Sequence, residues 1–130
     1  LWIVLFLLGL FFAVNPGEVR AATAFAVTSD NQLLRFNTDL PNVITPVGTV
    51  TGMQDGETIL GIDFRPATGE LYALGSNSRL YTVNTRTGEA AFVAALSVPL
   101  NGTNFGFDFN PTVDRIRIVS NTDQNLRVNC

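Results

Sequence analysis

Two aspartates in a repeated motif are the residues whose type and position could do chemistry. Asp63 lies in residues 61–64 and Asp108 in residues 106–109, and both segments have the pattern Gly-x-Asp-Phe. Paired carboxylates can hold a cation or a polar ligand, or act as an acid–base pair. If both side chains point into a central channel, they could form part of a ring of acids. We therefore take Asp63 and Asp108 as candidate ligand-binding residues.

The same aspartates also fit a structural role. A buried carboxylate must be paired or hydrogen-bonded. The backbone N–H groups of the turns that follow, residues 67–69 and 112–114, are candidate donors, and Arg65 and Arg115 are candidate ion-pair partners. Repetition favours this role, because every repeat has to build its turn whereas a binding site is needed only once.

A second polar group near the C-terminal end has the ligand types of a calcium site. Asn121, Asp123 and Asn125 offer side-chain oxygens at every second position. The segment lacks the glycine and the closing glutamate of a helix–loop–helix calcium loop. Polar hairpin turns have the same composition, so we favour a turn here. We expect no resident cofactor, and calcium is the one metal that these residues would suit.

The residue types that are missing exclude several catalytic schemes. The chain has no histidine, so neither a Ser-His-Asp nor a Cys-His nucleophile can be assembled within its 130 residues. No glycine-rich loop with the lysine of a phosphate-binding motif occurs. Tyr72, Tyr81 and Phe92 could form a sugar-stacking platform, but their spacing in strands favours packing between sheets.

Charge and cysteine content limit the partners and the compartment. Eight basic residues stand against eleven acidic ones, for a net charge of −3. Without a basic stripe we expect no nucleic-acid partner, and we expect a small molecule, a glycan or a protein instead. Cys130 is the one cysteine, so the chain can form no internal disulfide. An exported protein without disulfides suits a bacterial cell.

The elements that carry the two aspartates recur about every forty-five residues, a spacing typical of propeller blades. After the motif, residues 71–76 correspond to residues 116–120, and residues 79–84 to residues 125–129. An earlier copy lacks the motif but keeps the rest. Short β segments rich in Val, Ile, Phe, Tyr and Thr alternate with turn residues, and no stretch has helical periodicity. We expect strands at residues 24–28, 33–37, 43–47, 59–64, 71–75, 79–84, 90–96, 105–109, 115–120 and 125–129.

Grouped in fours, these strands predict an all-β fold, a fragment of a β-propeller-like repeat of four-stranded antiparallel blades, with about two and a half blades present. Several strands, such as residues 71–74, are apolar without alternation, as expected where blades stack on both sides. A sandwich is the rival fold, which explains the strands but not the repeat. We expect the first unit to lack its innermost strand, and exposed blade faces to make the chain self-associate.

The first fourteen residues form an unbroken apolar stretch, shorter than the roughly twenty residues that span a bilayer. Helix-breaking residues follow at 15–17, and small residues at 21–24 suit signal cleavage. We predict that residues 1–22 are an export signal, incomplete at its N-terminus, and that residues 23–130 are a propeller-like domain truncated at its C-terminus. The expected location is secreted or periplasmic in a bacterium, without membrane attachment once the signal is removed; an uncleaved anchor is the alternative.

Three segments carry a resemblance to a known family: residues 28–36, 61–69 and 106–117. In these motifs, and over essentially everything after the predicted signal, the chain resembles the bacterial domain-of-unknown-function family 4394. The resemblance implies an exported protein with propeller-like repeats. It implies no activity and no catalytic residues.

The sequence thus predicts an exported, non-catalytic binding or interaction module. The first alternative is a calcium-assisted propeller-type hydrolase or lactonase that uses inner-strand carboxylates, Asp63 and Asp108 among them. The second alternative is a structural component of the cell envelope.

Overall fold

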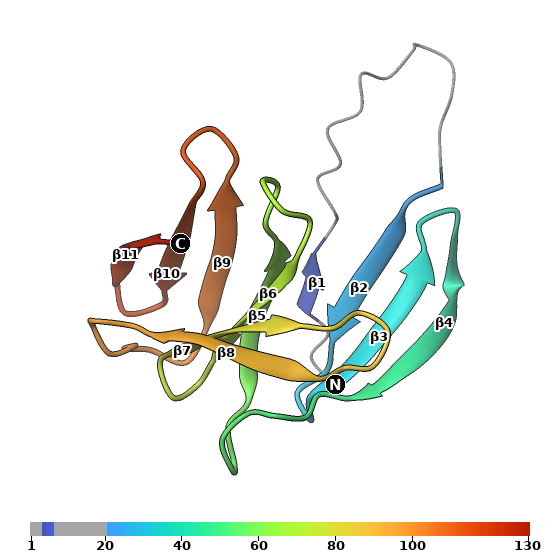
Figure 1. Cartoon of the computed structure of the whole chain (residues 1–130), viewed down its shortest axis with the longest axis horizontal. Coiled ribbons are helices and arrows are strands. Elements are labelled where there is room, and N and C mark those ends of the chain that lie inside the picture. Colours follow the sequence, from blue (N-terminus) through green and yellow to red (C-terminus); the bar gives the residue numbers. More distant parts are fainter. Residues whose placement is uncertain (1–3, 7–20) are drawn as a thin grey trace.

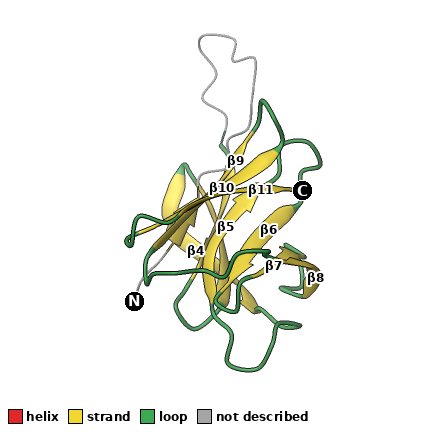
Figure 2. Ribbon diagram, turned by 90° about the vertical axis from the view of Figure 1, so that its left-hand side faces the viewer, coloured by secondary structure: helices red, strands yellow, loops and turns green. Residues whose placement is uncertain are grey.

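The computed structural model describes residues 4–6 and 21–130 of the chain (Figure 1). Within them the chain forms strands and loops but no helix, and so no helix that could cross a membrane (Figure 2). The strands are β1 (Val4–Phe6), β2 (Thr23–Val27), β3 (Gln32–Asn37), β4 (Leu40–Thr49), β5 (Ile59–Phe64), β6 (Leu71–Gly75), β7 (Arg79–Val83), β8 (Ala90–Ala95), β9 (Phe105–Asn110), β10 (Arg115–Ser120) and β11 (Asn125–Asn129).

Each sheet consists of strands that follow one another along the chain. Strands β1–β4 form the first sheet, β5–β8 the middle sheet and β9–β11 the third sheet, and all neighbours within a sheet are antiparallel. Figure 1 shows the first and third sheets on opposite sides of the middle one. The predicted all-β class is confirmed. The rival fold, a two-layer sandwich, does not fit, because there are three sheets and the middle one packs against a sheet on each side.

Strands β5–β7 of the middle sheet are largely buried on both faces, because their side chains alternate between two apolar clusters. On β6, Leu71 and Ala73 belong to a cluster shared with the first sheet, whereas Tyr72 and Leu74 belong to a cluster shared with the third sheet. All four side chains are at most 5% exposed. Burying both faces removes about twice the apolar area of a one-sided strand from water. This explains why the strand sequence has no polar–apolar alternation.

The third sheet packs on the middle sheet with one face and leaves the other polar. Phe107 of β9 and Ile116 of β10 point towards the middle sheet and are buried. The residues that alternate with them, Asp108, Arg117 and Arg127, are exposed. The outer face of this sheet is therefore built for contact with water or with a polar partner.

Most of the large exposed apolar side chains lie on edge strands of the other two sheets, and Val119 of β10 is an exception. Leu40, Val43 and Ile44 of β4, and Phe92 and Val93 of β8, are between 42% and 61% exposed. Self-association remains a prediction, and β4 and β8 are the strands that would carry it.

The first sheet contains a strand that the sequence analysis did not expect. Residues Val4–Phe6 form β1, which pairs antiparallel with β2 at one edge of that sheet and contacts β5 of the middle sheet. The expectation that the first unit starts at its second strand is therefore wrong. The apolar composition of this segment suits a strand as well as the core of a signal, so the export signal at residues 1–22 stays a prediction.

Three hairpins, β2–β3, β6–β7 and β10–β11, have turns with the same backbone conformation. Asn31, Ser78 and Asp123 take φ values of 62°, 61° and 63° in these turns. Short polar residues tolerate this left-handed region better than larger ones.

Equal turns allow the hairpins to be compared by cross-strand register. Leu74 lies opposite Leu80 in the middle sheet, and Val119 lies opposite Asn125 in the third. Leu80 therefore corresponds to Asn125 and Val83 to Val128, so residues 80–84 correspond to residues 125–129. The register agrees with the sequence match over these residues; the match also included residue 79, which precedes them.

Gly61 marks the closest approach of the middle and third sheets. A Cβ at this position would lie 2.7 Å from the Cβ of Phe107, whereas a Cβ at Gly106 would meet only a methyl carbon of Val119, at 2.9 Å. We expect Gly61→Ala to lower the free energy of unfolding by about 1–3 kcal/mol through overpacking. The matched variant Gly106→Ala should lower the free energy of unfolding by less than about 1 kcal/mol, because the Val119 side chain can rotate away from the added methyl group. Urea denaturation of both variants measures the difference, and equal losses would contradict the prediction.

Candidate functional site

Asp63 connects the middle sheet to the third sheet. Its Oδ2 accepts a hydrogen bond from the backbone N–H of Phe109 on β9 at 2.8 Å, and its Oδ1 accepts one from Phe64 at 2.9 Å. The expected donors in residues 67–69 are not used, because the N–H groups of Thr68 and Gly69 donate to the carbonyl of Arg65. Asp63 thus has a structural role, with a donor from the neighbouring sheet instead of its own turn.

Burial and a neighbouring acid disturb the titration of Asp63. Burial raises the pKa of its carboxyl from 3.8 to about 6, and the nearby carboxylate of Asp108 adds to the rise, while the hydrogen bonds from Phe109 and Phe64 oppose it. A carboxylate next to a like charge holds its proton more tightly. Below about pH 6 the Asp63 carboxyl can therefore hold its proton.

Asp108 occupies the same motif position on β9. Its side chain is exposed, and the residue lies opposite Arg117 of β10. In the turn that follows, the N–H of Thr112 donates to Oδ1 of Asn110, and not to Asp108. Because β5 and β9 contact each other, the two aspartates that the sequence singled out come together.

The arginine expected beside Asp63 pairs elsewhere. Nε of Arg65 donates to Oδ1 of Asp114 at 2.9 Å, and a second nitrogen of the guanidinium bonds to Oδ2. This ion pair joins the turn after β5 to the turn after β9, and the Arg65 guanidinium lowers the pKa of the Asp114 carboxyl. Asp63 and Asp108 are therefore left without a cationic partner from Arg65.

The two aspartates are suited to a ligand that brings positive charge or hydrogen-bond donors. Two close carboxylates repel each other, and a cation or a donor relieves the repulsion. Across the described residues no group of three or more His, Cys, Asp or Glu side chains gathers as a metal site. Further ligands to a metal would have to come from the bound molecule or from other parts of the protein.

A second carboxylate, which the sequence analysis missed, is buried in the middle sheet. Glu57 is 3% exposed and accepts hydrogen bonds from the hydroxyl of Tyr81, from the N–H of Gln54 at 3.2 Å and from the N–H of Asn77 at 3.1 Å. Burial raises the pKa of the Tyr81 hydroxyl, and the Glu57 carboxylate adds to this. The network ties the loop before β5 to the β6–β7 hairpin.

No sequence pattern identifies Glu57, because it lies in a polar loop between Gly56 and Thr58. One signal is Gly75, where a Cβ would lie 2.1 Å from Oε1 of Glu57. A strand glycine marks a place where another group approaches the backbone closely.

Asn121, Asp123 and Asn125 are placed in and beside the β10–β11 turn. Oδ1 of Asn121 accepts from the N–H groups of Thr103 and Asn104, and Oδ1 of Asn125 accepts from Arg117 at 2.6 Å. Asp123 is the turn residue with positive φ. The side-chain oxygens of the two asparagines are thus occupied by protein donors.

The three aromatic residues do not form an open platform. Tyr72 and Tyr81 are buried, and they contact Phe109 and Phe92 edge-on, with ring centroids 5.2 Å and 6.1 Å apart. Of the three candidates only Phe92 is exposed. Packing between and within sheets is therefore their role, as favoured from the sequence.

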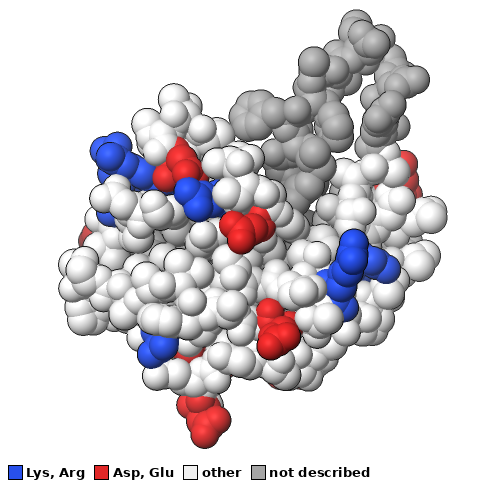
Figure 3. Space-filling view, viewed as in Figure 1, with Lys and Arg blue, Asp and Glu red and all other residues white. Residues whose placement is uncertain are grey.

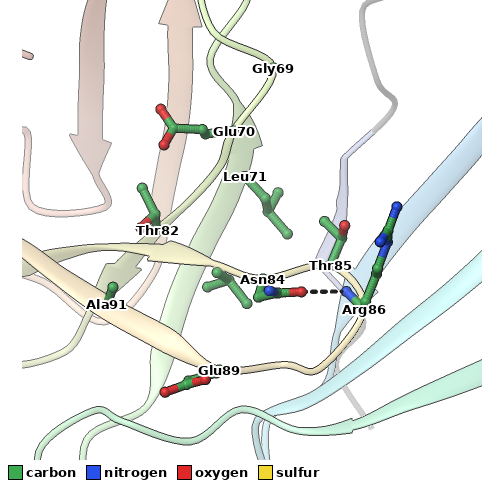
Figure 4. A pocket seen from close by; sticks show the side chains of 10 residues that line it. Gly69, Glu70, Leu71, Thr82, Asn84, Thr85, Arg86, Glu89 and Ala91 are labelled. Atoms are coloured by element: carbon green, nitrogen blue, oxygen red, sulfur yellow. Dashed lines mark hydrogen bonds between the residues drawn. The ribbon is translucent and has the colours of Figure 1, made fainter.

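A hollow of about 600 Å³ lies against strands β6–β8 of the middle sheet (Figure 4). Glu70 and Glu89 contribute acidic groups to it, and Thr82 and Ala91 line the sheet between them. Oδ1 of Asn84 accepts from the N–H of Arg86 at 2.9 Å, which fixes the turn at one end. Arg86 also lines this hollow, so its charged residues are two acids and one base.

Asp63→Asn should change how stability depends on pH. The raised pKa means that Asp63 binds a proton more tightly in the folded state than in the unfolded state, so protonation of Asp63 stabilises the fold. This contribution is complete below about pH 3.8 and is lost as the pH rises through about 6. Asparagine can still accept from Phe109. The free energy of unfolding of the variant, relative to that of the unmutated chain, should therefore rise by about 1–2 kcal/mol between pH 4 and pH 7.5, after allowance for solvent screening. Urea denaturation at several pH values measures this, and a difference that does not vary with pH would contradict it.

Tyr81→Phe should destabilise the fold through Glu57. Removing the hydroxyl leaves one buried carboxylate oxygen with a bond fewer, which costs about 1–3 kcal/mol. Tyr72→Phe is the matched control, because the Tyr72 hydroxyl accepts one long hydrogen bond, from the Arg65 guanidinium at 3.4 Å. Loss of this hydroxyl should lower the free energy of unfolding by less than about 1 kcal/mol. Thermal denaturation compares the two, and equal effects would show that the Glu57 network contributes little.

Comparison with known proteins gives a family but no named activity. A scan against family models matches residues 32–130 to the family described as "Domain of unknown function (DUF4394)". No curated protein and no solved structure matches the chain. The match covers β3 and every strand after it. The chain therefore belongs to this family of domains, as its aspartate motifs indicated.

Proposed function

We propose that the chain is part of an exported, non-catalytic binding module built as a propeller-like repeat, with a ligand site at the inner-strand carboxylates Asp63 and Asp108. The ligand is a small molecule, a glycan or a protein group that carries positive charge or several hydrogen-bond donors. The observation that carries the proposal is the contact of β5 with β9, where Asp63 accepts from the N–H of Phe109, the residue next to Asp108.

The sheet arrangement supports a propeller-like repeat. Each sheet is a meander of consecutive strands, and the first strands of the middle and third sheets, β5 and β9, contact each other, while β1 and β2 contact β5. In a propeller the first strand of each blade lines the central channel. Residues at the same position of successive first strands would then point to a shared site.

The case against catalysis rests on the missing histidine and on the hydrogen bonds that already occupy Glu57. Histidine is absent from the chain, and the buried Glu57 already accepts three hydrogen bonds. A rigid set of sheets with a polar site on neighbouring strands can bind without reacting.

One observation favours the alternative of a calcium-assisted hydrolase or lactonase. The pKa of Asp63 is raised to about 6 beside an exposed Asp108. Two carboxylates in different environments are the arrangement that supplies a general acid and a general base near neutral pH. A structural envelope component, the other alternative, would self-assemble without any ligand.

A calcium titration separates the binding module from the calcium enzyme. We expect less than about 1 °C change in the melting temperature of the chain in millimolar calcium, because two carboxylates are too few ligands for a calcium site. A rise of several degrees that Asp63→Asn/Asp108→Asn abolishes would contradict the non-catalytic proposal and favour the calcium enzyme. Glu70→Gln/Glu89→Gln is the matched control, since it removes the same charge from the hollow against strands β6–β8.

A further inference from the structure

The outer face of the third sheet carries three arginines around one hollow. Arg115 and Arg117 lie two residues apart on β10, and Arg127 lies directly opposite Arg117 on β11. The hollow has a volume of about 510 Å³ and is also lined by Asp108 and Asn110. Figure 3 shows basic side chains gathered over this part of the molecule, together with acidic ones.

Asp108 is the one acidic group that lines this hollow, and it lies opposite Arg117 on β9. The ion pair of that region joins Arg65 to Asp114, and none of the three arginines forms one with a described residue. Arg117 donates to the neutral amide of Asn125. Like charges directly opposite each other in a sheet destabilise it, so an anion bound over Arg117 and Arg127 would relieve a repulsion that the fold otherwise carries.

The corresponding place on the middle sheet has the opposite character. Tyr72 lies between Asp63 and Thr82 in cross-strand register, just as Arg117 lies between Asp108 and Arg127. Where the third sheet has arginines, the middle sheet has a buried tyrosine and a hollow with acidic Glu70 and Glu89 (Figure 4). The basic hollow is therefore a local feature of the third sheet, and not a property of every sheet.

The geometry points to a site for an acidic polysaccharide, a sugar polymer with carboxylate groups along its length. Arginine binds carboxylates through a planar fork of donors, and three arginines on two strands can bind carboxylates on successive sugars. The side-chain amide of Asn110, which lines the hollow, can bond to sugar hydroxyls. This goes beyond the proposed function, because it concerns the outer face of the third sheet and an anionic ligand.

Two other classes of polyanion fit less well. Single-stranded nucleic acid binding needs aromatic side chains for base stacking, and no residue that lines this hollow is aromatic. An extended acidic peptide normally adds a strand to a sheet edge, but the hollow lies over β10, which is paired on both sides.

Titration calorimetry of the whole 130-residue chain with polygalacturonate, at low salt and with a calcium chelator, tests this site. We expect binding that weakens as salt is added, and no binding of neutral dextran. Arg115→Gln/Arg127→Gln should weaken binding more than about ten-fold, because two charged hydrogen-bonding groups are lost. Arg35→Gln, which removes an exposed arginine from β3 of the first sheet, should change it less than two-fold.

A second variant tests the same site through a gain of affinity, which a misfolded variant could not produce. Asp108→Asn removes the one acidic group that lines the hollow, so it should strengthen polygalacturonate binding at least about two-fold. Absence of binding, equal binding of dextran, or an Arg115→Gln/Arg127→Gln variant that binds as well as the unmutated chain would overturn the inference. Tighter binding of oligothymidine or polyglutamate would overturn it in favour of those partners. Because this titration is done without free calcium, a negative result here does not decide the calcium titration that tests Asp63 and Asp108.

Discussion

Burial of both faces of the middle sheet is the constraint on which the rest of the structure depends. Leu71 and Ala73 are shielded from water because the first sheet covers them. Tyr72 and Leu74 are shielded from water because the third sheet covers them. Hydrophobic burial is the main favourable term in folding, so no sheet here is an independent unit. The polar contacts at the junctions, Asp63 with Phe109 and Arg65 with Asp114, then fix how the sheets lie against each other.

The same constraint explains how much of the fold could be predicted from the sequence. A strand that is apolar on both faces, such as residues 71–75, has to lie between two layers, and the strands and their antiparallel order follow from short segments separated by turns. The strand at Val4–Phe6 was missed because an apolar stretch fits several structures equally well.

The candidate site could be predicted in part, for reasons of the same kind. A repeated motif placed Asp63 and Asp108 on neighbouring first strands, which the contact of β5 with β9 brings together. The donor to Asp63 comes from another sheet, and a pattern within one repeat contains no information about it. Glu57 could not be found at all, since its burial depends on how a loop folds over the β6–β7 hairpin. The basic hollow depends on cross-strand neighbours that only the register defines.

The most direct test of the account is native-state hydrogen exchange of the chain, followed amide by amide across the middle sheet. If both faces of this sheet depend on its neighbours, the central amides of β6 and β7 should exchange only through global unfolding, with the same free energy as the buried amides of β9 and β10. Exchange of β6 and β7 through local opening, at a free energy well below that of the third sheet, would contradict the claim that the middle sheet is held between its neighbours.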